Sequence, residues 1–127
     1  MARSIVVTGA SKGIGRATAD ALADDGWHVF GIARRAPDGF PGEFLDTDLG
    51  DPVAVQGLAA ALAARGDVLG IVNNAGAARA EVFGEVDPAA FLDLMAFNLR
   101  PALMLTQALL PGMRRPASAG SSMSAAW

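Results

Sequence analysis

Thr8-Gly9-Ala10-Ser11-Lys12-Gly13-Ile14-Gly15 is the stretch that decides the fold, and it directly follows an apolar run at residues 5–7. The run, closed by Thr8 and Gly9, is typical of a buried strand, and residues 12–25 carry a helical pattern. A glycine-rich turn between a strand and a helix lets the backbone approach a pyrophosphate, to which the helix N-terminus presents free N–H groups. Glycines at such a turn can also serve backbone geometry alone. The place of this turn, after the first strand of an alternating pattern, favours phosphate binding.

The rest of the chain continues the alternation of strands and helices. Apolar runs predict strands at 27–33, 44–45 and 68–72, and helical patterns predict helices at 52–64 and 88–113. The sequence therefore predicts an α/β fold, a doubly wound parallel sheet of about four strands with helices on both faces. The expected buried stripes are Ile14, Ala17, Ala21 and Leu22 in the first helix and Val55, Leu58, Ala61 and Leu62 in the second.

Composition narrows the class of protein. The 127 residues are 52% hydrophobic, enough for one domain with a core, and the net charge is −3. No basic run is long enough to follow a phosphate backbone, so we expect no nucleic-acid partner. The chain has no cysteine, which excludes disulfides and thiolate metal sites, and we predict no metal site. The apolar run at 5–7 is too short for a signal peptide or a membrane span, so we expect a soluble cytoplasmic protein without a membrane partner.

Two motifs resemble those of the short-chain dehydrogenase/reductase family. The glycine turn 8–15 has that family's spacing, and Asn73-Asn74-Ala75-Gly76 matches the family's motif at the end of the fourth strand. The resemblance implies a Rossmann-type domain over residues 1–113 that lacks the C-terminal strands. It also implies a nicotinamide dinucleotide cofactor, and the residues expected to bind it are Gly9, Ser11, Lys12, Gly13, Ile14, Gly15, Asn74, Ala75 and Gly76. For the asparagine motif, a role in stabilising the sheet is an equal alternative.

The choice of cofactor depends on the residues that follow the second and third strands. Arg34 and Arg35 stand where a carboxylate would bind the ribose hydroxyls of NAD, and an arginine there would accept the 2′-phosphate of NADP. Lys12 adds a cation in the glycine turn, so we expect NADP, with NAD the less favoured choice. Two arginines after a strand can also be solvated surface charges. Asp48 and Leu49 resemble the family's adenine-binding pair, with Asp46 as the alternative to Asp48.

The catalytic groups of the family are the weakest part of the resemblance. Asn98 matches an asparagine that orders a water near the catalytic lysine, although asparagine there could simply loosen the helix near Pro101. The chain contains no tyrosine, and its single lysine, Lys12, lies in the glycine turn. His28 falls inside the second strand, where we expect an ordinary, partly exposed histidine.

We therefore expect the cofactor-binding part of an oxidoreductase that moves hydride between NADP and a carbonyl or alcohol, truncated before the family's Tyr-x-x-x-Lys and inactive alone. The alternatives are a non-catalytic dinucleotide-binding or dimerisation module, or a truncated product without function.

Residues 114–127 differ from the rest of the chain. They are small and lack periodicity, and we predict a disordered tail. Codons chosen for residues 116–127 and read two bases out of frame can spell an apolar strand ending in serines, as the family's next strand does, so a frameshift is our hypothesis for the tail. Without that next strand, the fourth strand would have an unpaired apolar edge at Ile71 and Val72, and the helix 88–113 would offer a surface for a homo-oligomer.

Overall fold

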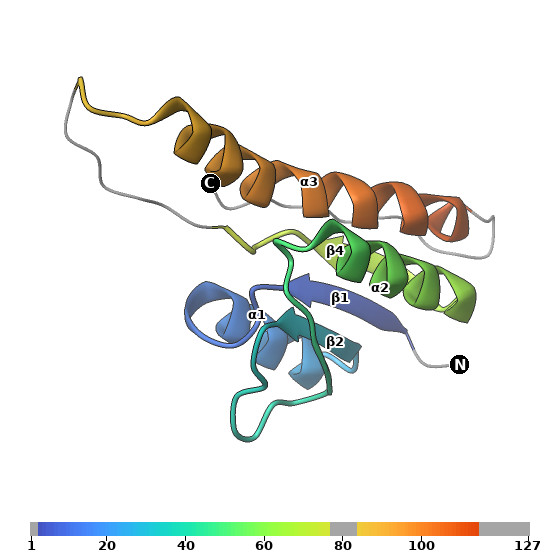
Figure 1. Cartoon of the computed structure of the whole chain (residues 1–127). Helices are drawn as coiled ribbons and strands as arrows, with labels where there is room; N and C mark the ends of the chain where they lie inside the picture. The colour runs from blue at the N-terminus through green and yellow to red at the C-terminus, as the bar shows by residue number, and fades with distance from the viewer. Residues whose placement is uncertain (1–2, 77–83, 115–127) are drawn as a thin grey trace.

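The computed structural model describes residues 3–76 and 84–114, and within them strands and helices alternate as predicted (Figure 1). The elements are β1 (Ser4–Thr8), α1 (Gly13–Asp24), β2 (His28–Ala33), β3 (Glu43–Asp46), α2 (Pro52–Arg65), β4 (Val68–Val72) and α3 (Pro88–Met113). The expected tail lies outside the described residues except for Arg114, which follows α3.

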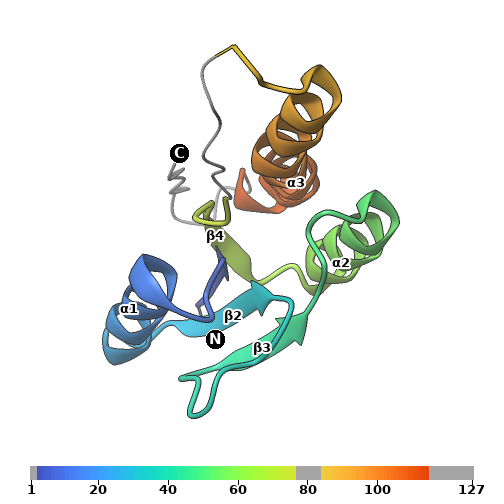
Figure 2. The same cartoon turned by 60° about the vertical axis from the view of Figure 1, so that its left-hand side comes forward.

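The strands form one parallel sheet in the order β3-β2-β1-β4. From β1 the chain winds outward through β2 to β3 and then returns to place β4 on the other side of β1. Helix α1 covers one face of the sheet, and α2 and α3 lie side by side on the other (Figure 2). The prediction of an incomplete doubly wound sheet is confirmed.

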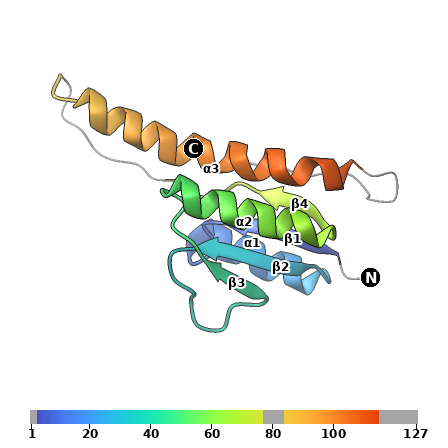
Figure 3. The ribbon, with the colours of Figure 1, turned by 45° about the vertical axis from the view of Figure 1, so that its right-hand side comes forward.

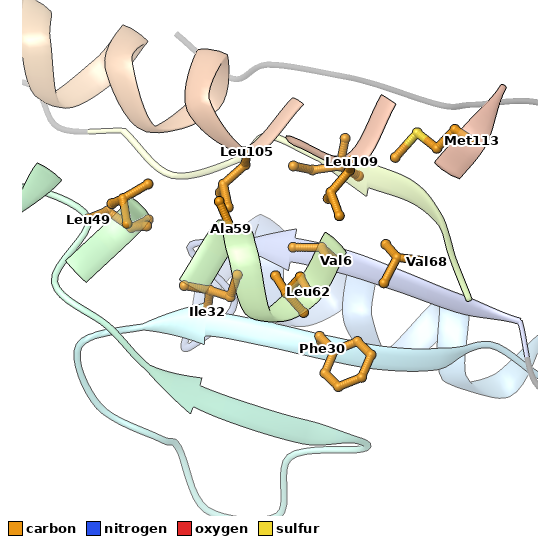
Figure 4. Packing of buried hydrophobic residues seen from close by; sticks show 12 residues of the cluster. Val6, Phe30, Ile32, Leu49, Ala59, Leu62, Val68, Leu105, Leu109 and Met113 are labelled. Atoms are coloured by element: carbon orange, nitrogen blue, oxygen red, sulfur yellow. The ribbon is translucent and has the colours of Figure 1, made fainter. Parts of the chain in front are cut away.

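Side chains alternate across β1 and divide the core into two layers. Ile5 and Val7 face α1, where they pack with Ala19. Val6 faces α2 and α3, and Figure 4 shows Leu105 and Leu109 of α3 reaching toward this layer. β1 is buried along its whole length because both faces of the sheet are covered there, and its three middle residues are all apolar.

The buried faces of both outer helices differ from the predicted stripes. In α1 the side chain of Ile14 is 73% exposed and Ala17 and Ala21 are exposed, while Gly15 and Ala19 are buried. Small residues at these two positions let α1 approach β1 closely, so the helix presents its small residues to the sheet instead of its larger ones. In α2 the buried residues include Val55 and Leu62 as predicted, but Ala59 replaces Ala61.

Aspartate caps start α2 and α3. The Asp51 side chain accepts a hydrogen bond from the backbone N–H of Val53 at 3.0 Å, and Asp87 accepts one from Ala89 at 3.1 Å. In each helix proline is at the first helical position. An N–H at that position has no acceptor within the helix, so its absence in proline costs no hydrogen bond.

A cluster of polar side chains closes the amino ends of the strands. Asp67 accepts hydrogen bonds from Ser4 Oγ at 3.0 Å and from Nε and Nη2 of Arg65 at 3.1 Å each. The Arg65 guanidinium also lies 4.7 Å from the centre of the Phe30 ring. Partial burial tends to raise the pKa of Asp67, but the hydrogen bonds from Arg65 and Ser4 prevail and hold this pKa below its usual value.

The edge of the sheet at β4 has no further strand beside it in the described chain, and the start of α3 is exposed. β4 pairs only with β1 there, as expected, although the Ile71 side chain is buried in the core. The first half of α3 projects beyond α2 (Figures 1 and 3). Its large apolar side chains that are exposed are Phe91, Leu92, Met95, Leu99 and Leu103. By length and composition α3 could cross a membrane, but core helices of soluble proteins pass the same test.

Candidate functional site

A pocket of about 680 Å³ opens at the carboxyl ends of the strands. Every strand of the described sheet contributes residues that follow or end it, and α3 contributes one side chain. The lining residues are Gly9, Ser11, Lys12, Ala33, Arg34, Arg35, Thr47, Asp48, Leu49, Ala75, Gly76 and Phe97. The volume is in the range usual for small-molecule and cofactor sites.

The glycine turn forms the floor between β1 and β4. Gly9 has φ +65°, and a Cβ on it would lie 3.0 Å from the Cα of Ala75, so both conformation and space require glycine. Gly13 has φ +60° with open space around it, so here the conformation alone is the reason. Lys12 is the N-cap residue of α1 but makes no side-chain cap bond.

The hydroxyl of Thr8 joins this turn to the end of β4. Thr8 Oγ1 accepts hydrogen bonds from the backbone N–H groups of Asn74 and Ala75, each at 3.0 Å, and lies 3.4 Å from the carbonyl oxygen of Val72, to which it donates. Asn74 Nδ2 donates in turn to the carbonyl oxygen of Gly9 at 3.3 Å. Because Thr8 is almost fully buried, water cannot serve as the hydrogen-bond acceptor for the two backbone N–H groups that follow β4. The Thr8 hydroxyl is that acceptor.

Asn73 makes a second connection, from β4 to α3. Its side chain is buried and its Nδ2 lies 3.4 Å from Oγ1 of Thr106. The paired asparagines thus stabilise the sheet and its helix, which supports the structural alternative for this motif alongside the ligand role.

Three cationic side chains and one carboxylate line the pocket, and we call the three cations its cationic wall. Lys12, Arg34 and Arg35 line the pocket together, and the acid among the lining residues is Asp48. Arg34 Nε lies 3.8 Å from Asp48 Oδ1, and this same oxygen accepts a hydrogen bond from the backbone N–H of Gly50 at 2.9 Å. An anionic group is the chemistry that this wall would attract.

Other side chains that line the pocket are apolar. Leu49 is buried in the core, and Phe97 of α3 is half-buried against the same cluster. Arg100, one turn further along α3, lies with Nη2 3.4 Å from the carbonyl oxygen of Gly50 and so connects α3 to the loop after β3. The pocket therefore offers apolar side chains to a flat ring and cationic side chains to phosphate groups.

The pocket brings together most of the cofactor residues that the sequence indicated. The predicted residues that line it are Gly9, Ser11, Lys12, Arg34, Arg35, Asp48, Leu49, Ala75 and Gly76. Those that do not are Gly13, Ile14, Gly15, Asn74 and Asn98. Gly15 and Asn74 pack behind the turn, and Asn98 lies on α3 next to Phe97. Asp46, the alternative to Asp48, is the last residue of β3 and is outside the lining.

Sequence reasoning missed Ala33, Thr47 and Phe97. Ala33 and Thr47 could have been found, since one ends β2 and the other follows β3. Phe97 had no such signal, because its place depends on how α3 crosses the sheet. His28, at the opposite, amino end of β2, packs edge-on against Phe30 at 4.7 Å and is distant from the pocket in the strand register, as expected. No cluster of three or more metal-ligating side chains occurs in residues 3–76 and 84–114.

Comparison with known proteins identifies the family of this chain. The family model of the short chain dehydrogenases matches residues 3–122. L-Xylulose reductase from Homo sapiens is 37% identical in an alignment of length 118 that covers 87% of this chain and 47% of that protein. The chain thus spans about half the length of the curated relatives it matches.

Two solved structures of similar proteins were determined with dinucleotides. NADH-dependent reductase A1-R′, complexed with NAD, is 29% identical with a TM-score of 0.82, over 96% of this chain and 57% of the reductase. A short chain dehydrogenase from Burkholderia cenocepacia, in complex with NADP, is 29% identical with a TM-score of 0.74, over 86% of this chain and 50% of its own.

Proposed function

Because the chain belongs to the short-chain dehydrogenase family, we propose that it forms the cofactor-binding part of an oxidoreductase that transfers hydride between NADP and a carbonyl or alcohol. The observation that carries this proposal is the pocket at the carboxyl ends of the strands, where the glycine turn meets a wall of three cations. A phosphate-binding turn at this edge of a doubly wound sheet is the arrangement expected for a dinucleotide.

The residues present fit a dinucleotide. Ser11, before the amino end of α1, would hold the pyrophosphate by its backbone N–H and the helix dipole. Gly9, whose own N–H donates to the carbonyl oxygen of Ile32 at 2.8 Å, would allow the close approach of the ligand. Leu49 and Ala75 offer small apolar surfaces for the adenine, and Asp48 beside them offers an acceptor for its amino group. When bound, the nicotinamide would supply or accept the hydride.

The preference for NADP over NAD rests on the charge of the cationic wall. Directly after β2 the chain presents Arg34 and Arg35 and no acid before Asp38, so the ribose hydroxyls of NAD would lack their usual carboxylate partner at the end of the strand. A 2′-phosphate would instead find Lys12 and Arg34 among the residues that line the pocket.

We also propose that the chain binds cofactor without turning over substrate by itself. The family's proton transfer needs a tyrosine with a nearby lysine, and the chain has no tyrosine and only Lys12. Asn98 would have its water-ordering role only beside that missing pair. This composition favours, as the second candidate, a non-catalytic dinucleotide-binding module. A cytoplasmic location without membrane or nucleic-acid partners belongs to the same proposal. It rests on the lack of a long basic run and on the packing of α3 into the core through Leu105 and Leu109.

Calorimetric titration of the purified 127-residue chain with NADPH and with NADH tests the binding proposal. We expect NADPH to bind more tightly. Arg34→Ala should weaken NADPH binding about tenfold or more, the value of a charge-assisted hydrogen bond, and change NADH binding little. Arg114→Ala, outside the pocket, is the matched control and should change neither.

Each part of the proposal can fail separately. Absence of binding by both dinucleotides would refute the cofactor role, and tighter binding of NADH would refute the NADP preference. Reduction of a carbonyl substrate by the isolated chain would show that it is not limited to binding.

A further inference from the structure

The contact between Arg34 and Asp48 differs from the other contacts of the pocket. It joins a residue of the cationic wall to the carboxylate that we propose as the acceptor for the adenine amino group. Arg34 Nε and Asp48 Oδ1 are 3.8 Å apart, and both residues line the pocket. The Arg34 side chain is 80% exposed and that of Asp48 is 51% exposed. Either group can therefore reach a ligand without a rearrangement of the core.

The two partners are held very differently. Asp48 Oδ1 accepts the backbone N–H of Gly50, and the next residue, Leu49, is buried, so the carboxylate has a fixed position. Arg34 is a long side chain at the end of β2, and Asp48 is the ion-pair partner it has in the described structure. Of the two, only the guanidinium can move over a large range.

We propose that Asp48 lowers the preference of the pocket for a 2′-phosphorylated nucleotide by competing with the phosphate for Arg34. This rests on the proposed dinucleotide function and adds a specificity-determining residue to it. In the free protein the carboxylate holds the guanidinium, and a 2′-phosphate must draw it away or share it. A nucleotide without that phosphate leaves the ion pair intact, so Asp48 affects the two ligands unequally.

The expected effect is modest because the pair is exposed. An exposed ion pair changes an equilibrium by about two- to fivefold. Asp48→Asn keeps an oxygen that can accept from Gly50 N–H and removes the charge that holds Arg34. The variant should therefore increase the ratio of affinities for adenosine 2′,5′-bisphosphate over 5′-AMP by about two- to fivefold.

The experiment measures this ratio by calorimetry for the full 127-residue chain at low and at high salt, since screening should shrink the effect. Asp46→Asn makes the same charge change at the end of β3, outside the pocket, and should leave the ratio unchanged. Asp48→Asn should also leave the ratio nearly unchanged when Arg34→Ala is already present, because the competition needs the guanidinium. Far-ultraviolet circular dichroism verifies that each variant is folded, and Asp48→Ser serves as the second variant if Asp48→Asn does not fold.

The possible outcomes distinguish a failure of the competition for Arg34 from a failure of the dinucleotide function. A ratio that rises only when Arg34 is present supports the competition. A ratio that is unchanged or falls, or that rises equally without Arg34, overturns it while leaving the dinucleotide function standing. Failure of both nucleotides to bind the unmodified chain overturns the function and this inference together.

Discussion

Replacing Gly15 with alanine should destabilise the protein although alanine is the better helix former. Gly15 is in the first turn of α1 and is buried. A Cβ at this position would overlap the carbonyl oxygen of Gly9 and would lie 2.5 Å from Nδ2 of Asn74. The first obstacle is backbone, so it cannot rotate away, and the second is the side chain that holds the turn against β4.

The magnitude follows from two opposing terms. Exchanging glycine for alanine inside a helix gains up to about 1 kcal/mol from helix propensity. Overpacking against fixed atoms costs about 3 kcal/mol, at the upper end of the usual range. The net loss is about 2 kcal/mol, which for a domain of this size lowers the melting temperature by roughly 7 °C.

Urea unfolding followed by circular dichroism measures this loss, and Gly57→Ala is the matched control. Gly57 is in the middle of α2, and a Cβ there would meet nothing within 4 Å. The control should therefore raise the free energy of unfolding by up to about 1 kcal/mol. If Gly15→Ala proved as stable as the control, the close packing of the glycine turn against α1 would be wrong.

Three further outcomes test other parts of the structure. Thr8→Val should lower the free energy of unfolding by about 2 kcal/mol or more in a urea titration, because two buried N–H groups lose their acceptor, whereas Thr8→Ser should recover most of it. Asp67, whose pKa is lowered on folding, should stabilise the chain above about pH 4 and lose this contribution as the pH falls through its folded pKa; denaturation of Asp67→Asn should show a smaller stability difference between pH 6 and pH 3, and an equal difference would contradict the cluster with Arg65. Leu92→Lys combined with Leu103→Lys should reduce self-association in sedimentation experiments with little change in stability, since both side chains are exposed; unchanged association would place the contact on another surface.

Much of the candidate site could be predicted because it depends on local chemistry at strand ends. The glycine turn, the arginines after β2 and the Asp48-Leu49 pair each follow a strand, and parallel strands bring their carboxyl ends to one edge. The register between Asp46 and Asp48 could not be decided from the pattern, because a strand of four residues has no fixed end in sequence. It is settled by the pairing of Asp46 with Ala33, which leaves Asp48 beyond the sheet.

The predicted helix faces failed for a different reason. Periodicity identifies an apolar stripe, but which side of α1 approaches the sheet depends on how close the two can come. Gly15 and Ala19 permit the closest approach, so these small residues are buried and the larger Ile14 is left exposed.

The glycine turn and the alternation of strands and helices around it therefore predicted the class of fold, a phosphate-bearing ligand and the edge of the sheet where it would bind. The strand, the turn and the helix are local structures, and the residues that specify the turn lie within the eight positions 8–15. Only the tertiary structure decided what surrounds that turn: Phe97 in the pocket wall, the Thr8 hydroxyl that joins it to β4, and the pairing of Arg34 with Asp48. These contacts join residues that are far apart in the chain. Their distances depend on how the strands and helices pack, which cannot be deduced from the pattern of neighbouring residues.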